Sequence, residues 1–268
     1  MDKISELSKK QKNDEKILIA NVLDKINYVK TRNNYENTFF LDLSQQFKVE
    51  KMLQLRKFED YEFFGGFEKA ERKMLFIFSD KIFNYEENKN EIYNKAMSVI
   101  NLKLTKEQYG QYEHKTYLGA LIKLGIKREM IGDIIVKNEG AEIIISSEVE
   151  KYVMSNLKLL TRFQKSEIEK IKIEDINYIA PKTKIVNIIV PSMRLDAIVS
   201  ELAKCSRNEA QELIEQERVC VNFNEELVCS KKVEINSFIS IRGKGRFKIL
   251  NEIGKTKHGN LNIEVEVW

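Results

Sequence analysis

Side chains in the last third of the chain have the types and the spacing that phosphate binding requires. Arg207 and Gln211 are four residues apart, and Arg218 follows Arg207 by eleven residues. On a helix these three positions project near one face, and Arg194 and Lys204 lie on the segment just before it. A guanidinium group matches the geometry of a phosphate better than the point charge of a lysine does. This pattern predicts a surface that binds nucleic acid.

The competing interpretation is an ordinary solvated helix surface. Four glutamates at positions 209, 212, 215 and 217 lie in the same segment, and residues 191–268 hold 12 basic and 12 acidic residues. The whole chain has a net charge of +4 and a pI of about 8.7, which permits a polyanionic partner without requiring one. Net charge therefore does not distinguish a nucleic-acid surface from a solvated helix surface, and the arrangement of the charges must do so.

Other residue types offer little for catalysis or metal binding. The chain has only two histidines and three cysteines, with no CxxC pair, so we expect no metal site, no disulfide and no cofactor. It has no glycine-rich nucleotide loop and no nucleophile elbow, so we expect no small-molecule substrate. Residues 1–15 lack the apolar stretch of a secretory signal, and no apolar run approaches the ~20 residues of a membrane span. We therefore expect a cytoplasmic protein without membrane contact.

The hydrophobic pattern predicts an α+β fold with three domains. Residues 1–73 are expected to form a helical N-terminal domain, because apolar residues recur at helical spacing from Ile17 to Ile26 and from Leu43 to Phe58. Residues 74–180 carry two short strands, a helix, a hairpin, a second helix and a last strand, an order that predicts a ferredoxin-like (RNA-recognition-motif-like) middle domain. The aromatic signature of RNA-recognition motifs is absent, so stacking of RNA bases on the sheet is not predicted.

Residues 174–184 are expected to be a linker or a connecting strand, and residues 186–268 the third domain. Ser206 and Glu209 form a capping box that begins the second of two short helices. Short strands follow, with a basic turn at Gly243–Arg246.

The third domain resembles the S-four RNA-binding domain, which is named after a ribosomal protein of the small subunit. The resemblance rests on the strings Arg194-Leu-Asp196, Ser206-Arg207, Glu209-Ala210, Leu213-Ile214 and Val219-x-Val-Asn222. It implies an αα-β arrangement with a basic surface that grips structured RNA. The RNA-binding residues assigned on these grounds are Arg194, Asp196, Lys204, Ser206, Arg207, Gln211, Arg218, Asn222, Arg242, Lys244 and Arg246.

Further segments resemble the bacterial YlmH family: Ile241–Phe247, Tyr117–Leu121, Leu124–Glu129 and Gly132–Val136. This resemblance implies a non-catalytic RNA-binding protein that acts on the ribosome. Its partners would be rRNA, tRNA or both, on a large subunit that carries stalled peptidyl-tRNA in ribosome-associated quality control. Away from the ribosome we expect a monomer.

Three positions depart from the family pattern, which usually has glycine there. Glu217 and Phe223 replace two such glycines, and Asn236-Ser237 replaces a common Gly-Asp pair. Since glycine and asparagine tolerate left-handed turns best, Glu217 is expected to reshape the end of the second helix.

Two alternatives to this function remain open. Arg194-Leu-Asp196 matches the tripeptide that holds the catalytic aspartate of pseudouridine synthases, although a catalytic domain of the usual size does not fit behind it. YlmH genes often lie near cell-division genes, so a protein adaptor in cell division is the second alternative.

A second contact with RNA is predicted in the middle domain at Lys115, Lys127 and Arg128, with solvated surface charge as the competing interpretation. Gly119 is expected to permit close helix packing, and Gly125 is expected to end its helix in a left-handed cap.

Overall fold

The computed structural model describes residues 3–79, 85–178 and 184–268, and its chain divides into two compact units, Met1–Ile179 and Ala180–Trp268. The linker predicted for residues 174–184 lies partly outside the described residues. None of the described helices is long and apolar enough to cross a membrane.

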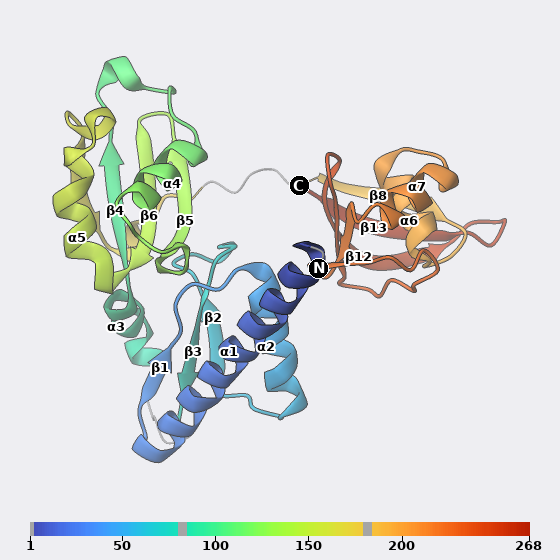
Figure 1. Ribbon diagram of the computed structural model, residues 1–268, viewed down its shortest axis with the longest axis horizontal. Helices are drawn as coiled ribbons and strands as arrows, with labels where there is room; N and C mark the ends of the chain where they lie inside the picture. Colours follow the sequence, from blue (N-terminus) through green and yellow to red (C-terminus); the bar gives the residue numbers. More distant parts are fainter. Residues whose placement is uncertain (1–2, 80–84, 179–183) are drawn as a thin grey trace. The chain divides into compact units, whose positions relative to one another are not determined.

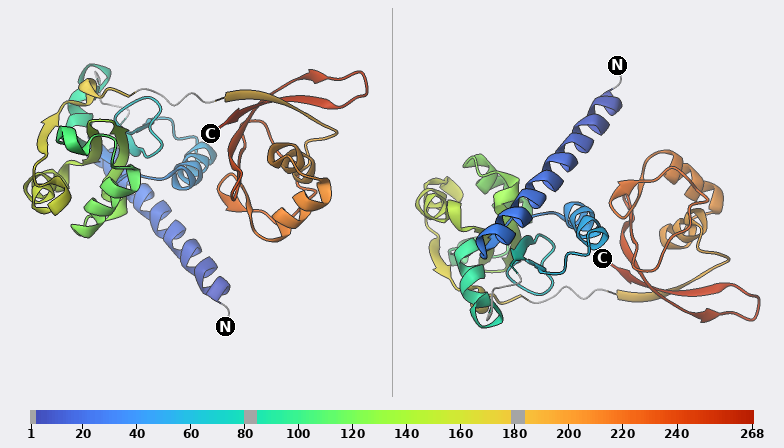
Figure 2. Two further views of the ribbon diagram at one scale, coloured as in Figure 1. Left: turned by 90° about the horizontal axis from the view of Figure 1, so that it is seen from above. Right: turned by 90° about the horizontal axis from the view of Figure 1, so that it is seen from below.

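The first unit begins with two helices and a three-stranded antiparallel sheet (Figure 1). The elements are α1 (Lys3–Arg32), β1 (Tyr35–Asn37), α2 (Leu43–Leu55), β2 (Tyr61–Phe64) and β3 (Met74–Phe78). The strand order is β1-β3-β2, so β3, which sequence analysis grouped with the middle domain, is the central strand of this first sheet. The sheet itself was not predicted, because β1 and β2 are too short to show a periodicity of two. Figure 2 shows the first turns of α1 projecting from the rest of this unit.

The apolar run of β3 is explained by burial on both faces of its sheet. Leu75 and Ile77 pack in a core with residues of α1 and α2, whereas Met74, Phe76 and Phe78 pack in a second core on the opposite face. Side chains of a strand alternate between faces, so a strand covered on both sides is apolar throughout.

The middle part has the βαββαβ order of a ferredoxin-like fold, as predicted. Helix α3 (Tyr85–Ala96) leads into β4 (Met97–Lys103), α4 (His114–Lys123), β5 (Ile131–Lys137), β6 (Gly140–Ser146), α5 (Glu150–Asn156) and β7 (Glu167–Ile171). The antiparallel strands are in the order β5-β6-β4-β7. Short 3-10 turns, η1 to η6, are at Lys106–Gln108, Arg128–Met130, Ser147–Val149, Leu157–Leu159, Thr161–Phe163 and Ile173–Asp175.

Both faces of this four-stranded sheet are covered. Helices α4 and α5 pack on one face through Tyr117, Leu121 and Val153. On the other face, Val99 and Ile144 lie in a core with residues of α3 and β3. Base stacking on the sheet is therefore blocked by packing within the unit, in line with the missing aromatic signature.

Two glycines of this region were given structural roles from sequence. Gly125 has a φ of +83°, and its N–H donates to the carbonyl oxygen of Ile122 at 2.9 Å, which confirms the left-handed cap. The packing role predicted for Gly119 is wrong, because a Cβ at that position would have no described heavy atom within 4 Å.

The second unit places two helices on one face of a six-stranded antiparallel sheet (Figure 1). Its elements are β8 (Lys184–Val190), α6 (Leu195–Ala203), α7 (Arg207–Glu215), β9 (Val219–Val221), β10 (Asn224–Glu225), β11 (Phe238–Ile241), β12 (Gly245–Lys255) and β13 (Leu261–Val267). The strand order is β10-β9-β11-β12-β13-β8. Phe247, Ile249 and Val265 point toward the helices, and Figure 2 shows the β12–β13 hairpin extending past them.

The positions where the family usually has glycine are left-handed in this chain. Glu217, Phe223 and Asn236 have φ angles of +58°, +66° and +67°. A left-handed conformation costs a residue with a Cβ roughly 1–2 kcal/mol, which glycine avoids. The chain therefore forms left-handed turns at these three positions without glycine.

Candidate nucleic-acid interface

The turn between α6 and α7 positions the predicted RNA-binding residues. Lys204 ends α6 with a φ of +54°, and Ser206 begins α7. The predicted capping box is present: the Ser206 hydroxyl accepts from the Glu209 N–H at 3.3 Å, and the Ser206 N–H donates to Oε2 of Glu209 at 2.7 Å. The left-handed Lys204 and the capping box at Ser206 thus fix where α6 ends and where α7 begins. Side chains from the first turn of α6 therefore contact side chains of α7.

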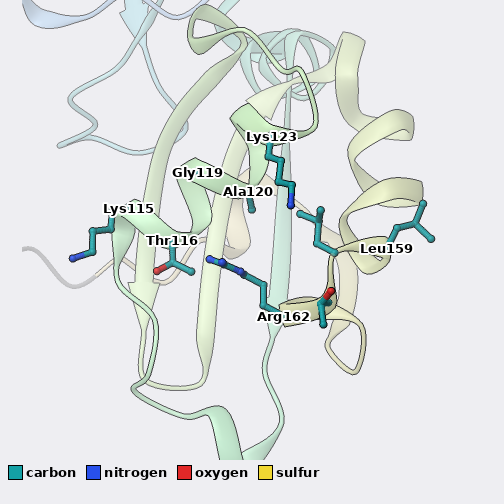
Figure 3. Close-up of a pocket in the computed structure, with 9 residues that line it drawn as sticks. Lys115, Thr116, Gly119, Ala120, Lys123, Leu159 and Arg162 are labelled. Atoms are coloured by element: carbon teal, nitrogen blue, oxygen red, sulfur yellow. The ribbon is translucent and has the colours of Figure 1, made fainter.

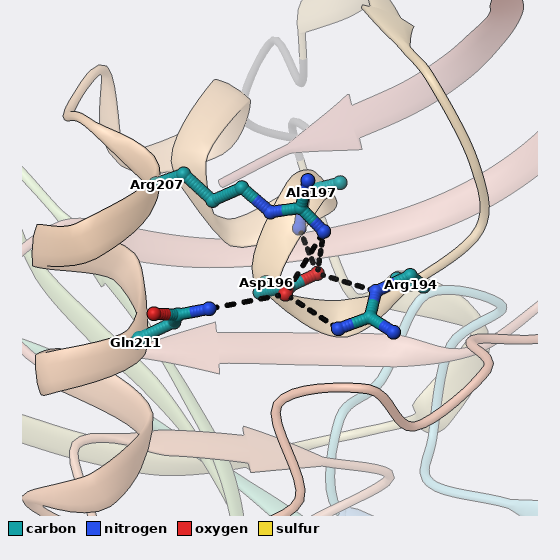
Figure 4. Close-up of polar contacts among 5 residues, drawn as sticks. All are labelled: Arg194, Asp196, Ala197, Arg207 and Gln211. Atoms are coloured by element: carbon teal, nitrogen blue, oxygen red, sulfur yellow. Dashed lines mark hydrogen bonds and ion pairs between the residues drawn. The ribbon is translucent and has the colours of Figure 1, made fainter.

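Asp196 lies at the centre of this meeting point (Figure 4). Its carboxylate accepts hydrogen bonds from Nη2 of Arg194 at 2.8 Å, from Nη2 of Arg207 at 3.1 Å and from Nε2 of Gln211 at 3.4 Å. Nε of Arg194 and the backbone N–H of Ala197 donate to the other carboxylate oxygen at 3.2 and 2.8 Å. The Asp196 side chain has no exposed surface, yet the hydrogen bonds from Arg194 and then Arg207 lower its pKa to about 2. The carboxylate is therefore ionised and fully engaged at neutral pH.

This geometry corrects the role given to Asp196. A carboxylate with no exposed surface and several donors around it cannot accept further hydrogen bonds from RNA. The side chains of Arg194 and Arg207 remain 42% and 50% exposed. Asp196 thus holds two guanidinium groups in place at the surface, and each keeps outward N–H donors for a ligand.

Arg218 does not share the α7 face on which sequence analysis placed it. The helix ends before Glu217, and Nη2 of Arg218 donates to the carbonyl oxygen of Arg242 at 3.3 Å. The Arg242 N–H donates to the carbonyl oxygen of Arg218 at 2.9 Å. Arg218 therefore supports the β11–β12 turn instead of extending the row formed by Arg207 and Gln211.

The β11–β12 turn also bears charge near the start of α7. Hydrogen bonds with Ser206 lower the pKa of Glu209, and the exposed Lys244 ammonium lowers it further. Lys244 thus interacts electrostatically with a residue of the first turn of α7, where unpaired helix N–H groups favour an anion. Arg242 and Lys204 are exposed as well, and neither side chain forms an ion pair with a described residue.

Three further residues predicted to bind RNA contribute to turns, a helix cap or a strand of the second unit: Asn222, Ser206 and Arg246. The side-chain oxygen of Asn222 accepts the Phe238 N–H at 2.9 Å, and its φ is +49°, so Asn222 shapes a turn. Ser206 caps α7. Arg246 lies half-buried on β12, opposite Ser240 of β11.

The three residues of the second RNA contact predicted in the middle domain have different surroundings: Arg128 is bound to backbone, whereas Lys115 and Lys127 are exposed. Arg128 donates through Nη1 to the carbonyl oxygen of Ile131 at 2.7 Å, and burial lowers the pKa of its guanidinium. Arg128 therefore has a structural role, which corrects its assignment. Lys127 is exposed, and its Nζ lies 3.9 Å from Oε1 of Glu129. Lys115 is also exposed, and its Nζ lies 2.9 Å from Oε2 of Glu113.

Comparison with known proteins adds the family context. Residues 91–177 match the family described as "Putative RNA-binding domain in YlmH", and residues 193–236 match the S4 domain, the S-four type named above. The chain is 28% identical over 263 residues to "Ribosome-associated protein quality control protein P2" of Bacillus subtilis (strain 168), covering 98% of this chain and 99% of the relative. A solved structure, "Cell division protein ylmH from Streptococcus pneumoniae", aligns at a TM-score of 0.46 with 19% identity, covering 61% of this chain and 95% of that chain. RNA-binding domains are thus present in both structural units.

Proposed function

We propose that this chain, which matches the RNA-binding domain of YlmH and the S4 domain, is a YlmH-family protein that acts in the cytoplasm on the ribosome as a non-catalytic RNA-binding protein. We propose that the S-four domain binds rRNA or tRNA on a large subunit that carries stalled peptidyl-tRNA, in ribosome-associated quality control. Away from the ribosome the protein is a monomer in this proposal.

The observation that carries the proposal is the pair of half-exposed arginines, Arg194 and Arg207, held by a buried carboxylate. Fixing an arginine side chain before binding reduces the side-chain entropy that binding must remove. A second group of cations, Arg242 and Lys244, lies on the turn near the same helix end. Together they offer several charged donors to phosphate oxygens.

The same geometry supports the absence of pseudouridine synthase chemistry at Asp196. A catalytic aspartate must reach the base on which it acts, whereas the Asp196 side chain has no exposed surface and is surrounded by its own donors. New pseudouridine in ribosomal RNA after incubation with the pure protein, lost in Asp196→Ala, would overturn this part of the proposal.

The main test is co-sedimentation of the full chain with purified large subunits. Arg242→Glu combined with Lys244→Glu reverses two exposed charges that make no ion pair with described residues, so the fold should be retained. Because a charged hydrogen bond is worth ~1.5–3 kcal/mol, subunit binding should weaken roughly 10-fold or more. The control is Lys257→Glu in the β12–β13 turn, which should bind like wild type. Wild-type protein that does not sediment with large subunits would refute the proposal.

A further inference from the structure

A basic pocket lies on the helical side of the middle domain, between α4 and the turns η4 and η5 (Figure 3). Its volume is about 380 Å³. One wall is the outer face of α4 and the other is the turn that follows α5. The lining residues are Lys115, Thr116, Gly119, Ala120, Lys123 and Leu159–Arg162.

All charged side chains that line this pocket are positive. Lys115, Lys123 and Arg162 contribute three cations, and no carboxylate lines the pocket. Figure 3 shows Arg162 reaching from η5 toward α4, with Lys123 directed into the space between them. Among the described residues, neither of these two side chains forms a hydrogen bond or an ion pair. Lys115 pairs with Glu113, but both side chains are more than 70% exposed, so the pair is weak and easily exchanged for another anion.

Neutral groups complete a lining suited to a nucleic-acid backbone. Thr116 and Thr161 add hydroxyl donors, which commonly contact phosphate oxygens. Leu159 is 74% exposed at the edge of the pocket and offers an apolar surface to a ribose or a base. The pocket thus combines cations, hydroxyl groups and a small apolar contact.

A glycine inside helix α4, Gly119, is a second feature of this pocket that points to a ligand. Glycine inside a helix is destabilising relative to alanine, so it normally reflects a steric need. No steric need exists within the protein, because a Cβ there would meet no described heavy atom within 4 Å. The missing side chain leaves helix backbone bare in the wall of the pocket, where a ligand can approach closely.

We propose that this pocket binds phosphodiester groups of the RNA backbone and forms a second RNA contact, apart from the S-four domain. The inference rests on the proposed function, because it assumes that RNA is the partner. The opposite face of the sheet is buried in the core, so the helical side is the available surface of this domain. Of the three cations in this pocket, only Lys115 is among the RNA contacts predicted from the sequence. The four-residue spacing of Lys115, Gly119 and Lys123 was readable on a helix, whereas nothing in the sequence connects Arg162 to them.

The test measures binding of full-length protein to a fluorescent single-stranded ribosomal RNA fragment. Lys123→Glu combined with Arg162→Glu should weaken affinity roughly 10-fold or more. Two lost phosphate contacts should also reduce the slope of log K against log salt by about 1.4. The matched control, Lys151→Glu combined with Lys158→Glu, makes the same charge change outside the pocket lining and should change affinity less than about 3-fold. Gly119→Ala should weaken RNA binding, because its Cβ covers the backbone that the ligand approaches although it meets no described protein atom, and Gly119→Glu should weaken RNA binding further.

The outcomes separate this inference from the proposed function. If the pocket variants bind RNA like wild type while Arg242→Glu with Lys244→Glu does not, the pocket inference is wrong and the S-four site stands. If the wild-type protein itself does not bind RNA, both are wrong. If millimolar inorganic phosphate raises the melting temperature of wild type but not of the pocket variants, while their RNA affinity is unchanged, the pocket binds free phosphate and the RNA contact is refuted.

Discussion

Replacing Asp196 with asparagine removes the charge that holds Arg194 and Arg207 while keeping the shape of the side chain. The pKa of Asp196 is about 2, well below the ordinary value of 3.8 for an aspartate. At roughly 1.4 kcal/mol per pKa unit, ionisation of this group stabilises the fold by at most about 2 kcal/mol. Because both arginines are half-exposed and screened by water, we expect Asp196→Asn to lower the free energy of unfolding by about 1–2 kcal/mol at pH 7.

The pH dependence of this difference follows from the direction of the shift. A carboxyl group whose pKa is lower in the folded state contributes stability above its unfolded pKa, and that stability is lost as the pH falls through the folded pKa. The difference between wild type and Asp196→Asn should therefore be constant above about pH 5. It should shrink as the pH falls from 4 toward 2.

The assay is urea unfolding followed by the fluorescence of Trp268, which is the only tryptophan and lies in the same unit as Asp196. Titrations at pH 7, 5 and 3 give the stability difference directly. Glu234→Gln removes an exposed carboxylate of the same unit and should change stability by less than about 0.5 kcal/mol. Equal stability of Asp196→Asn and wild type at pH 7, or a difference as large at pH 3 as at pH 7, would refute the reasoning.

Three further predictions concern the same unit. Glu217→Gly should raise the free energy of unfolding by about 0.5–1 kcal/mol, because glycine relieves the left-handed conformation at φ +58°. Gln216→Gly, one residue earlier at φ −84°, should lower it, and thermal melts that rank the two variants the other way would contradict the backbone argument. Ser206→Ala should lower the free energy of unfolding by about 1 kcal/mol, because the cap of α7 is lost. An unchanged urea midpoint would show that α7 does not depend on its capping box. RNA affinity should fall steeply between 50 and 200 mM salt, as counterion release requires, and a flat salt titration would exclude phosphate contacts as its main source.

Much of the architecture was readable from sequence because its signals are local. The capping box at Ser206 and the left-handed glycine at Gly125 each involve residues within four positions of one another, so both were predicted and both are present. Alternation and helical spacing likewise marked β4, α4 and α7, whose apolar faces pack in the cores. The spaced positions of the S-four resemblance belong to the same class of signal, since they lie on two consecutive helices and the strand that follows.

What only the tertiary structure decided depends on segments that are distant in sequence. Asp196 was expected at the RNA surface, but packing of α6 against α7 buries it and makes it the acceptor for Arg207 and Gln211. The pocket of the middle domain joins α4 to the turns η4 and η5, whose first lining residue, Leu159, follows Lys123 by 36 residues. Periodicity reports which side of a single element is apolar. It does not report which charged side chains of different elements meet, because that depends on how the elements pack.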